Sequence, residues 1–173
     1  MAENANDTNR SLLLLGLRNA HAMEKEAQQV IERQLDRLEK YPRVEARLRQ
    51  HLEETNHQLR RLEEALAGFD QQPSALKDVA TSLMGNMMAM AHVPAGDEIL
   101  KNSFANAAVE QFEIAAYKSL FTIGEAVGQN QVVSLLQPSL QEEQAMATWL
   151  DENLRDVTLT YMRLRTESGD ASH

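Results

Sequence analysis

Four long stretches of this sequence repeat apolar residues at the three- and four-residue spacing of an α-helix. The repeats predict helices over about residues 9–40, 42–69, 97–127 and 131–154. Pro42 separates the first two helices, because a proline disfavours helical geometry at the residue before it. Gly128 separates the last two in a tight turn. Helices joined by such short turns pack antiparallel, so the sequence predicts two helical hairpins.

Residues 70–96 connect the two hairpins, and Ser74 is a candidate N-cap for a short methionine-rich helix over about 74–91. One long crossover between two hairpins is typical of a ferritin-like four-helix bundle, whereas simple up-and-down bundles have only short loops. The sequence therefore predicts an all-α fold with a single domain over residues 1–173, made of a core bundle at about 9–154, this crossover helix and a C-terminal tail at 155–173, in which residues 157–164 can add helix. Pro138 predicts a kink or a restart of the last helix near Gln137.

The composition excludes several classes of protein. The chain has 173 residues, of which 43% are hydrophobic, so it can bury a sizeable core. It has no cysteine, which excludes disulfides and cysteine zinc sites. A formal charge of −9 argues against nucleic acid as a partner. No apolar run approaches the ~18 residues of a membrane span, and the polar N-terminus does not resemble a signal peptide, so we expect a cytoplasmic protein.

Several glutamates fall among apolar residues when the helices are drawn as wheels of about 100° per residue. Glu24 lies near the centre of the apolar stripe of the first helix, and Glu143 lies near the middle of the stripe of the fourth. The third helix is apolar almost all round, and both Glu110 and Glu113 point among its apolar side chains. Glu54 lies at the edge of the stripe of the second helix.

Carboxylates in such positions need a compensating charge. An ionised carboxylate alone in an apolar core costs several kcal/mol, and neighbouring carboxylates raise each other's pKa. Metal cations remove both problems. The alternative is that each glutamate pairs with a buried arginine or lysine, but the basic residues on these stripes are too few to match the glutamates. The pattern therefore favours a metal site.

The spacing of the acidic residues resembles a known metal motif. Di-iron carboxylate bundles use one Glu from each of two helices and a Glu-x-x-His from each of the other two. The second helix carries Glu54-Thr-Asn-His57, and the doubled glutamate of the third helix resembles the arrangement in rubrerythrin. Carboxylate and imidazole ligands suit iron or manganese. We predict a site for one or two ions of iron or manganese, with ligands drawn from Glu24, Glu54, His57, Glu110, Glu113 and Glu143.

Three details of this site stay open at the level of sequence. His57 lies further from the apolar stripe than Glu54, so either His57 or Gln58 can face the site. Met146 stands where the fourth helix is expected to carry a second histidine, which leaves both one and two ions open. Tyr117 lies one turn after Glu113 and can bond a ligand carboxylate or another buried partner.

Five segments spread over nearly the whole chain resemble the bacterial YciE/YciF stress-protein family. They are His21-Ala-Met-Glu24-Lys-Glu, Gln50-His-Leu-Glu-Glu54-Thr, Asp97-Glu-Ile-Leu-Lys101, Glu110-Gln-Phe-Glu-Ile-Ala-Ala-Tyr117-Lys-Ser-Leu and Glu142-Glu-Gln-Ala-Met-Ala-Thr-Trp149-Leu. The resemblance implies a ferritin-like fold, a homodimer and a link to stress responses. It implies no established reaction.

Two functions are consistent with these observations. The first is a metal protein that reacts with O2 or peroxide, or that holds iron. The second is a non-catalytic interaction or structural protein of the stress response, whose metal site is degenerate. Glu110 beside Glu113 favours the first by supplying a replacement ligand, whereas Met146 favours the second. The sequence leaves open whether the protein is an enzyme.

Overall fold

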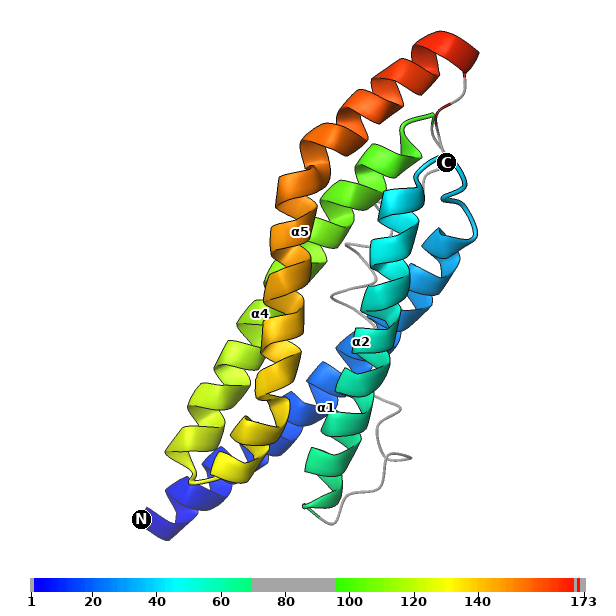
Figure 1. Cartoon of the computed structure of the whole chain (residues 1–173). Coiled ribbons are helices and arrows are strands. Elements are labelled where there is room, and N and C mark those ends of the chain that lie inside the picture. Colours follow the sequence, from blue (N-terminus) through cyan, green and yellow to red (C-terminus); the bar gives the residue numbers. More distant parts are fainter. Residues whose placement is uncertain (1, 70–95, 170, 172–173) are drawn as a thin grey trace.

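The computed structural model of the protein describes residues 2–69, 96–169 and 171. Within these residues it contains four α-helices and no strand. The helices are α1 (Ala2–Leu35), α2 (Pro42–Ala67), α4 (Glu98–Ala126) and α5 (Asn130–Ser168), as Figure 1 shows. The crossover helix predicted over about 74–91 lies outside the described residues.

The four helices form a bundle of two antiparallel hairpins. Helix α1 packs on α2 and α4 packs on α5, while α1 also contacts α4 and α2 also contacts α5. The chain leaves α2 at one end of the bundle and enters α4 at the opposite end (Figure 1). The end of α2 and the start of α4 therefore lie at opposite ends of the bundle, as the predicted ferritin-like topology requires.

The first helix differs from its prediction at both ends. It begins at Ala2 rather than near residue 9, and the Ser11 hydroxyl donates a 2.9 Å hydrogen bond to the carbonyl oxygen of Asp7, as a serine inside a helix does. It ends at Leu35 rather than near residue 40. Two turns follow, and they bury Leu38 and Tyr41 against the core. Burial of these apolar side chains ends the helix before Pro42.

Most of the segment predicted as a C-terminal tail over residues 155–173 is helical, because α5 continues to Ser168 and so includes residues 157–164, for which added helix was the alternative. Val157 is buried in this extension, and the Tyr41 hydroxyl donates a 2.8 Å hydrogen bond to the carbonyl oxygen of Ala171. Contacts with the turn between α1 and α2 thus hold this part of the chain. Pro138 lies inside α5 without interrupting it, so the predicted restart does not occur.

The turn between α4 and α5 follows the predicted glycine signal. Gly128 has a φ of 72°, which is the left-handed conformation that glycine adopts without strain. Its backbone N–H donates to the carbonyl oxygen of Glu125, and the N–H of Gln129 donates to that of Gly124. These bonds satisfy carbonyl groups at the end of α4.

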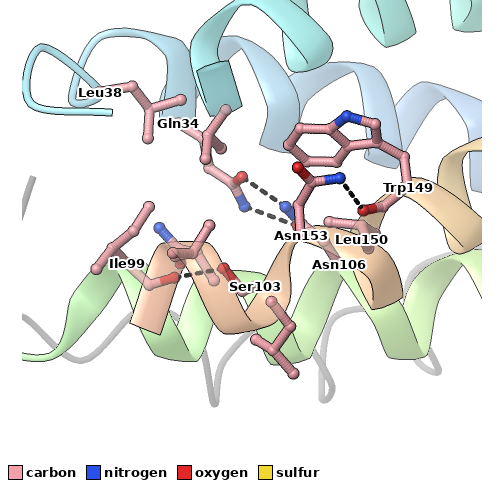
Figure 2. A pocket seen from close by; sticks show the side chains of 12 residues that line it. Gln34, Leu38, Ile99, Ser103, Asn106, Trp149, Leu150 and Asn153 are labelled. Atoms are coloured by element: carbon pink, nitrogen blue, oxygen red, sulfur yellow. Dashed lines mark hydrogen bonds between the residues drawn. The ribbon is translucent and has the colours of Figure 1, made fainter. Parts of the chain in front are cut away.

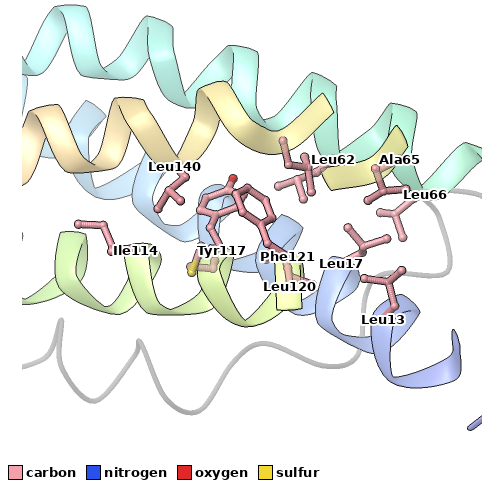
Figure 3. Close-up of a cluster of buried hydrophobic side chains, with 14 of the residues drawn as sticks. Leu13, Leu17, Leu62, Ala65, Leu66, Ile114, Tyr117, Leu120, Phe121 and Leu140 are labelled. Atoms are coloured by element: carbon pink, nitrogen blue, oxygen red, sulfur yellow. The ribbon is translucent and has the colours of Figure 1, made fainter. Parts of the chain in front are cut away.

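Two clusters of buried apolar side chains fill the bundle, one toward each end. The first gathers around Leu17, Leu62, Tyr117 and Leu140 (Figure 3). The second includes Ile31, Leu48, Ile99, Met146 and Leu150. In every helix, buried glutamate or other polar side chains lie between members of these two clusters. The fold therefore presents one polar layer inside an otherwise apolar core.

A pair of buried amides crosses the second cluster between α1 and α4. The side chains of Gln34 and Asn106 exchange two hydrogen bonds of 3.0 and 2.9 Å beside a small pocket, as Figure 2 shows. Each amide supplies the other with a hydrogen-bond donor and an acceptor, so this buried polar contact needs no further partner. In the described part of the chain, no helix is long and apolar enough to cross a membrane.

Candidate functional site

Four buried side chains from three helices converge in the polar layer. They are His51 of α2, Glu110 and Glu113 of α4, and Glu143 of α5. Each offers one nitrogen or carboxylate oxygen, and these four atoms all lie within 4.8 Å of one another. All four side chains are at most 3% exposed, so bulk water does not compensate their charges.

Helical spacing brings each of these residues to the bundle axis. Glu110 and Glu113 lie three residues apart, which places them on one side of α4. Glu143 continues the buried series of Leu136 and Leu140, at steps of four and three residues. On α2, a buried series of the same kind joins His51, Thr55, Gln58 and Leu62. The same amphipathic pattern that buries leucines therefore buries the polar groups.

Helix α1, the one described helix not yet represented in the polar layer, contributes Glu24. Its side chain is 1% exposed, and its Oε1 atom accepts a 2.8 Å hydrogen bond from the hydroxyl of Tyr117, which is fully buried. Burial raises the pKa of Glu24 to about 8, although the Tyr117 hydrogen bond and the charge of His51 act in the opposite direction. The structure thus gives Tyr117 a carboxylate partner, one of the two alternatives left open by the sequence.

His51 lies between buried and partly exposed carboxylates. Its Nε2 atom is 3.3 Å from Glu110 Oε1 and 3.6 Å from Glu143 Oε2. Its Nδ1 atom is 3.1 Å from Oε2 of Glu54, and an ionised carboxylate only accepts, so Nδ1 carries a proton whether or not Nε2 does. Burial lowers the pKa of His51, but the charge and hydrogen bond of Glu110 and the other carboxylates outweigh burial and raise it well above its usual value.

The carboxyl groups of Glu113 and Glu143 resist ionisation. Burial raises the pKa of Glu113 well above its usual value, and the charges of Glu143, Glu24 and Glu110 raise it further. The pKa of Glu143 is also raised well above its usual value, by burial first and then by Glu24 and Glu110. In the absence of a cation, these groups are held protonated or repel one another. Added positive charge in the cluster would therefore stabilise the ionised form of these carboxyl groups.

Several buried oxygen atoms in this layer have no hydrogen-bond partner in the part of the chain that the structure describes. They are Glu110 Oε2, Glu113 Oε1, Glu143 Oε2 and Gln58 Oε1. Buried polar atoms in native proteins are nearly always paired, so these acceptors need either protons shared between the neighbouring carboxyl groups or a cation. The nearby arginines do not fill this role, because Arg47 pairs with Glu54 and Arg61 pairs with Glu142.

The residues predicted from the sequence divide into two groups. Glu24, Glu110, Glu113 and Glu143 are all buried in the layer, as the wheels predicted. The structure does not bring Glu54 and His57 into it. Glu54 is partly exposed and contacts the outer nitrogen of His51, together with Arg47 and Gln50.

His57 is exposed, whereas its neighbour Gln58 is fully buried, so Gln58 is the residue that faces the layer. The Glu-x-x-His motif did not identify His51 as a candidate ligand, because the histidine precedes the glutamate there. The segment from His51 to Glu54 has the same spacing in reverse. The signal that would have found His51 is its phase, since Thr55 and Gln58 follow it at helical spacing on the buried face.

Met146 takes no part in the polar layer. It is fully buried and packs in the second apolar cluster with Ile31, Leu48 and Leu150. The helix α5 therefore contributes one carboxylate to the layer and an apolar side chain one turn later. Within the described residues, His51 supplies the imidazole of the cluster.

Comparison with solved structures places the fold among known proteins. A protein from Xanthomonas campestris pv. campestris superimposes with a TM-score of 0.77 and 28% identity, over 92% of this chain and 99% of that chain. The Escherichia coli stress protein YciF gives a TM-score of 0.73 and 21% identity, over 86% and 95% of the two chains. YcfI from Rhodopseudomonas palustris gives 0.69 and 27%, over 83% and 92%.

These similarities agree with the resemblance to YciE/YciF proteins noted from the sequence, and they confirm the ferritin-like helical bundle. A family described as "Domain of unknown function (DUF892)" matches residues 8–163, which cover all four helices for most of their length. The chain therefore belongs to the family described as Domain of unknown function (DUF892).

Proposed function

We propose that this protein binds one or two ions of iron or manganese in the polar layer of its bundle. The observation that carries the proposal is that Glu110, Glu113 and Glu143 each have an unpaired buried oxygen and converge with His51 in one place. Acceptor-only groups of this kind are ligands for hard divalent cations, and an imidazole shifts the preference toward iron or manganese. A bound cation would supply the missing positive charge.

The spacing of the donor atoms suits a single ion. First-row divalent ions hold nitrogen and oxygen ligands at about 2.0–2.2 Å, so ligands on opposite sides lie roughly 4.0–4.4 Å apart. The four candidate atoms lie within 4.8 Å of one another. Small side-chain shifts would bring them to bonding distance. His51 Nε2 would then bind the ion, while Nδ1–H donates to Glu54, the outer hydrogen bond that metal-bound histidines usually make.

Glu24 would either bind a second ion or balance the charge of the first. It is fully buried on the α1 side of the layer, and its charge influences the pKa of both Glu113 and Glu143. Tyr117 holds one of its oxygens at 2.8 Å. Because imidazole reaches the layer from His51 and Met146 supplies none, two ions would sit in unequal surroundings. We therefore expect one tight position and one weaker position.

A redox-active ion at this site would supply electrons to O2 or peroxide. The chain's own residues would bind the ion, limit access of water through the apolar clusters on either side, and exchange protons at Glu113 and Glu143 as charge changes. YciF, whose structure is similar, is described as a stress protein. Removal of an oxidant or of free iron during stress is the role that fits both this description and the site.

Metal loading of the purified protein tests the proposal. Metal-free protein is mixed anaerobically with Fe²⁺ or Mn²⁺, passed over a desalting column and analysed for metal. We expect at least one ion per chain, and a Glu143→Ala variant that retains far less. Wild-type protein that holds well below one ion per chain would rule out the proposal and leave a structural role in the stress response. Consumption of O2 or peroxide by the loaded protein then tests the reaction separately.

The homodimer implied by the family resemblance remains a prediction. Analytical ultracentrifugation of the metal-free and metal-loaded protein tests it. A dimer would sediment as a particle of two chains. A particle of one chain at micromolar concentration would contradict it.

A further inference from the structure

Gln58 links the buried carboxylates to an ion pair at the edge of the bundle. Its Nε2 atom donates hydrogen bonds to Glu143 Oε1 and, at 3.1 Å, to Glu142 Oε2. Arg61 holds both oxygens of Glu142 through bonds of 2.7 and 2.9 Å, and also donates to the hydroxyl of Ser139 at 3.1 Å. One fully buried amide therefore joins a fully buried carboxylate to a partly buried, fixed ion pair.

These two carboxylates determine which way the amide of Gln58 points. The Glu142 carboxylate, held by Arg61, only accepts hydrogen bonds, and so does Glu143 once it is ionised as a metal ligand, so the NH2 group faces both. The reversed amide would set its carbonyl oxygen against two oxygen atoms and lose both bonds. The Oε1 atom of Gln58 consequently lies on the other side of the amide. There it is buried and has no hydrogen-bond partner among the residues that the structure describes.

The unpaired oxygen of Gln58 belongs with the unpaired carboxylate oxygens of the same layer. All of them are acceptors, and a hydrated divalent cation offers both positive charge and O–H donors to such a set. We propose that Gln58 is a positioning residue of the metal site: its NH2 group fixes the Glu143 ligand, and its carbonyl oxygen accepts a hydrogen bond from water bound to the ion. This inference rests on the proposed function, since it assigns a task to one residue around the proposed ion.

Gln34 provides a matched control for Gln58. It is also a buried glutamine that bridges two helices through its amide, but its partner is Asn106 in the second apolar cluster. Replacement of either glutamine by methionine keeps the size of the side chain and removes buried hydrogen bonds. A purely structural effect on binding would therefore appear in both variants, whereas an effect on the ion would appear only at Gln58.

Anaerobic titration with Co²⁺, followed by visible absorption, measures affinity and coordination in the same experiment. Wild-type protein is expected to bind Co²⁺ and to develop d–d bands. In Gln58→Met, we expect the affinity to fall by about 10- to 100-fold, the range for residues that orient metal ligands, and the bands to shift. In Gln34→Met, we expect affinity and bands of the wild type, even where the melting temperature falls.

A second variant guards against misfolding of Gln58→Met. Glu142 is partly exposed, so Glu142→Ala should fold while it removes one of the two acceptors that orient the amide. We expect its affinity to fall by less than about tenfold, with shifted bands. Wild-type affinity and bands in Gln58→Met, or in Glu142→Ala if Gln58→Met does not fold, would overturn the inference. An equal loss of affinity in Gln34→Met would also overturn it.

The two proposals fail in different ways. Wild-type protein that binds neither Co²⁺ nor Mn²⁺ would overturn the proposed function together with this inference. Wild-type binding that Gln58→Met leaves unchanged would overturn the role of Gln58 alone, and the site would then rest on His51 and the carboxylates.

Discussion

The Nε2 atom of His51 lies 3.3 Å from Oε1 of Glu110, deep between helices α2 and α4. Neither helix alone gives this contact, because the two residues meet only when the hairpins pack together. The contact places His51, and not His57, among the carboxyl groups of the candidate site. His57, the histidine of the Glu-x-x-His segment, is exposed to solvent.

Separate substitution of each histidine tests whether His51 or His57 contributes to metal binding. We expect His51→Leu to lower the affinity for Mn²⁺ or Fe²⁺ by at least tenfold, because it removes the imidazole of the cluster. The matched variant His57→Leu should bind metal as the wild type does, because its side chain points to solvent. Equilibrium dialysis at fixed pH measures both affinities. Loss of binding in His57→Leu with retention in His51→Leu would reverse the assignment.

Replacement of Glu113 by glutamine should stabilise the metal-free protein while it weakens metal binding. Burial and the neighbouring carboxylates oppose the charge of Glu113, and an amide of the same shape carries none. We expect the free energy of unfolding in EDTA at pH 8 to rise by on the order of 1–3 kcal/mol. Urea denaturation measures it, with the exposed Glu53→Gln as the control that changes little. A less stable Glu113→Gln protein would show that this carboxylate is not destabilising.

The stability of the metal-free protein should decrease as the pH rises from about 5 to about 8. Glu24 has a pKa of about 8 in the folded protein against 4.5 as its ordinary value, so the folded state binds more protons within this window. A group with a raised pKa stabilises the fold at low pH and loses that contribution as the pH rises through the folded value. At about 1.4 kcal/mol for each pKa unit, the expected loss is a few kcal/mol.

His51 changes stability in the same direction, since its pKa is also raised above its ordinary 6.5. Urea denaturation in EDTA at several pH values measures the sum. Saturating Mn²⁺ should remove the decline, because the cation replaces the protons that the carboxylates hold. A metal-free protein whose stability increases steadily from pH 5 to pH 8 would contradict this electrostatic description.

Removal of the Tyr117 hydroxyl should loosen Glu24. In Tyr117→Phe, the 2.8 Å hydrogen bond to Glu24 Oε1 is lost and the ring keeps its packing in the first apolar cluster. We expect a stability loss of about 1 kcal/mol and a 10- to 100-fold lower affinity at the weaker metal position. Calorimetric titration with Mn²⁺ resolves the two positions, with Tyr161→Phe as the control. Unchanged binding would show that Tyr117 has only a packing role.

The length of α5 gives a test of the fold itself. A chain that ends after Leu154 would retain all candidate ligands but lose the contacts of Val157 and Ala171 with the rest of the protein. We expect its melting temperature to fall by several degrees, since each lost kcal/mol lowers it by roughly 2–4 °C in a domain of this size. Thermal unfolding by circular dichroism measures the change. An unchanged melting temperature would agree with the tail expected from the sequence.

The sequence by itself determined the helices, the two hairpins and the burial of Glu24, Glu110, Glu113 and Glu143. Each of these properties follows from local chemistry, namely the helical phase of apolar residues, a proline or glycine at a turn, and a carboxylate in phase with leucines. Helix ends were less predictable. Helix α1 ends at Leu35, before the turns that bury Leu38 and Tyr41 against residues far away in the chain. Helix α5 ends after Ser168 at Gly169, a left-handed glycine cap whose N–H donates to the carbonyl oxygen of Arg165.

Only the tertiary structure decided which polar groups of different helices meet. A helical wheel gives the direction of a side chain about its own axis, but it gives neither the height at which two helices face each other nor the partner across the gap. Packing of α2 against α5 sets Gln58 beside Glu143, and packing of the hairpins sets His51 beside Glu110. The sequence could therefore predict buried carboxylates, whereas the identity of the imidazole and of the amide that complete the site required the fold.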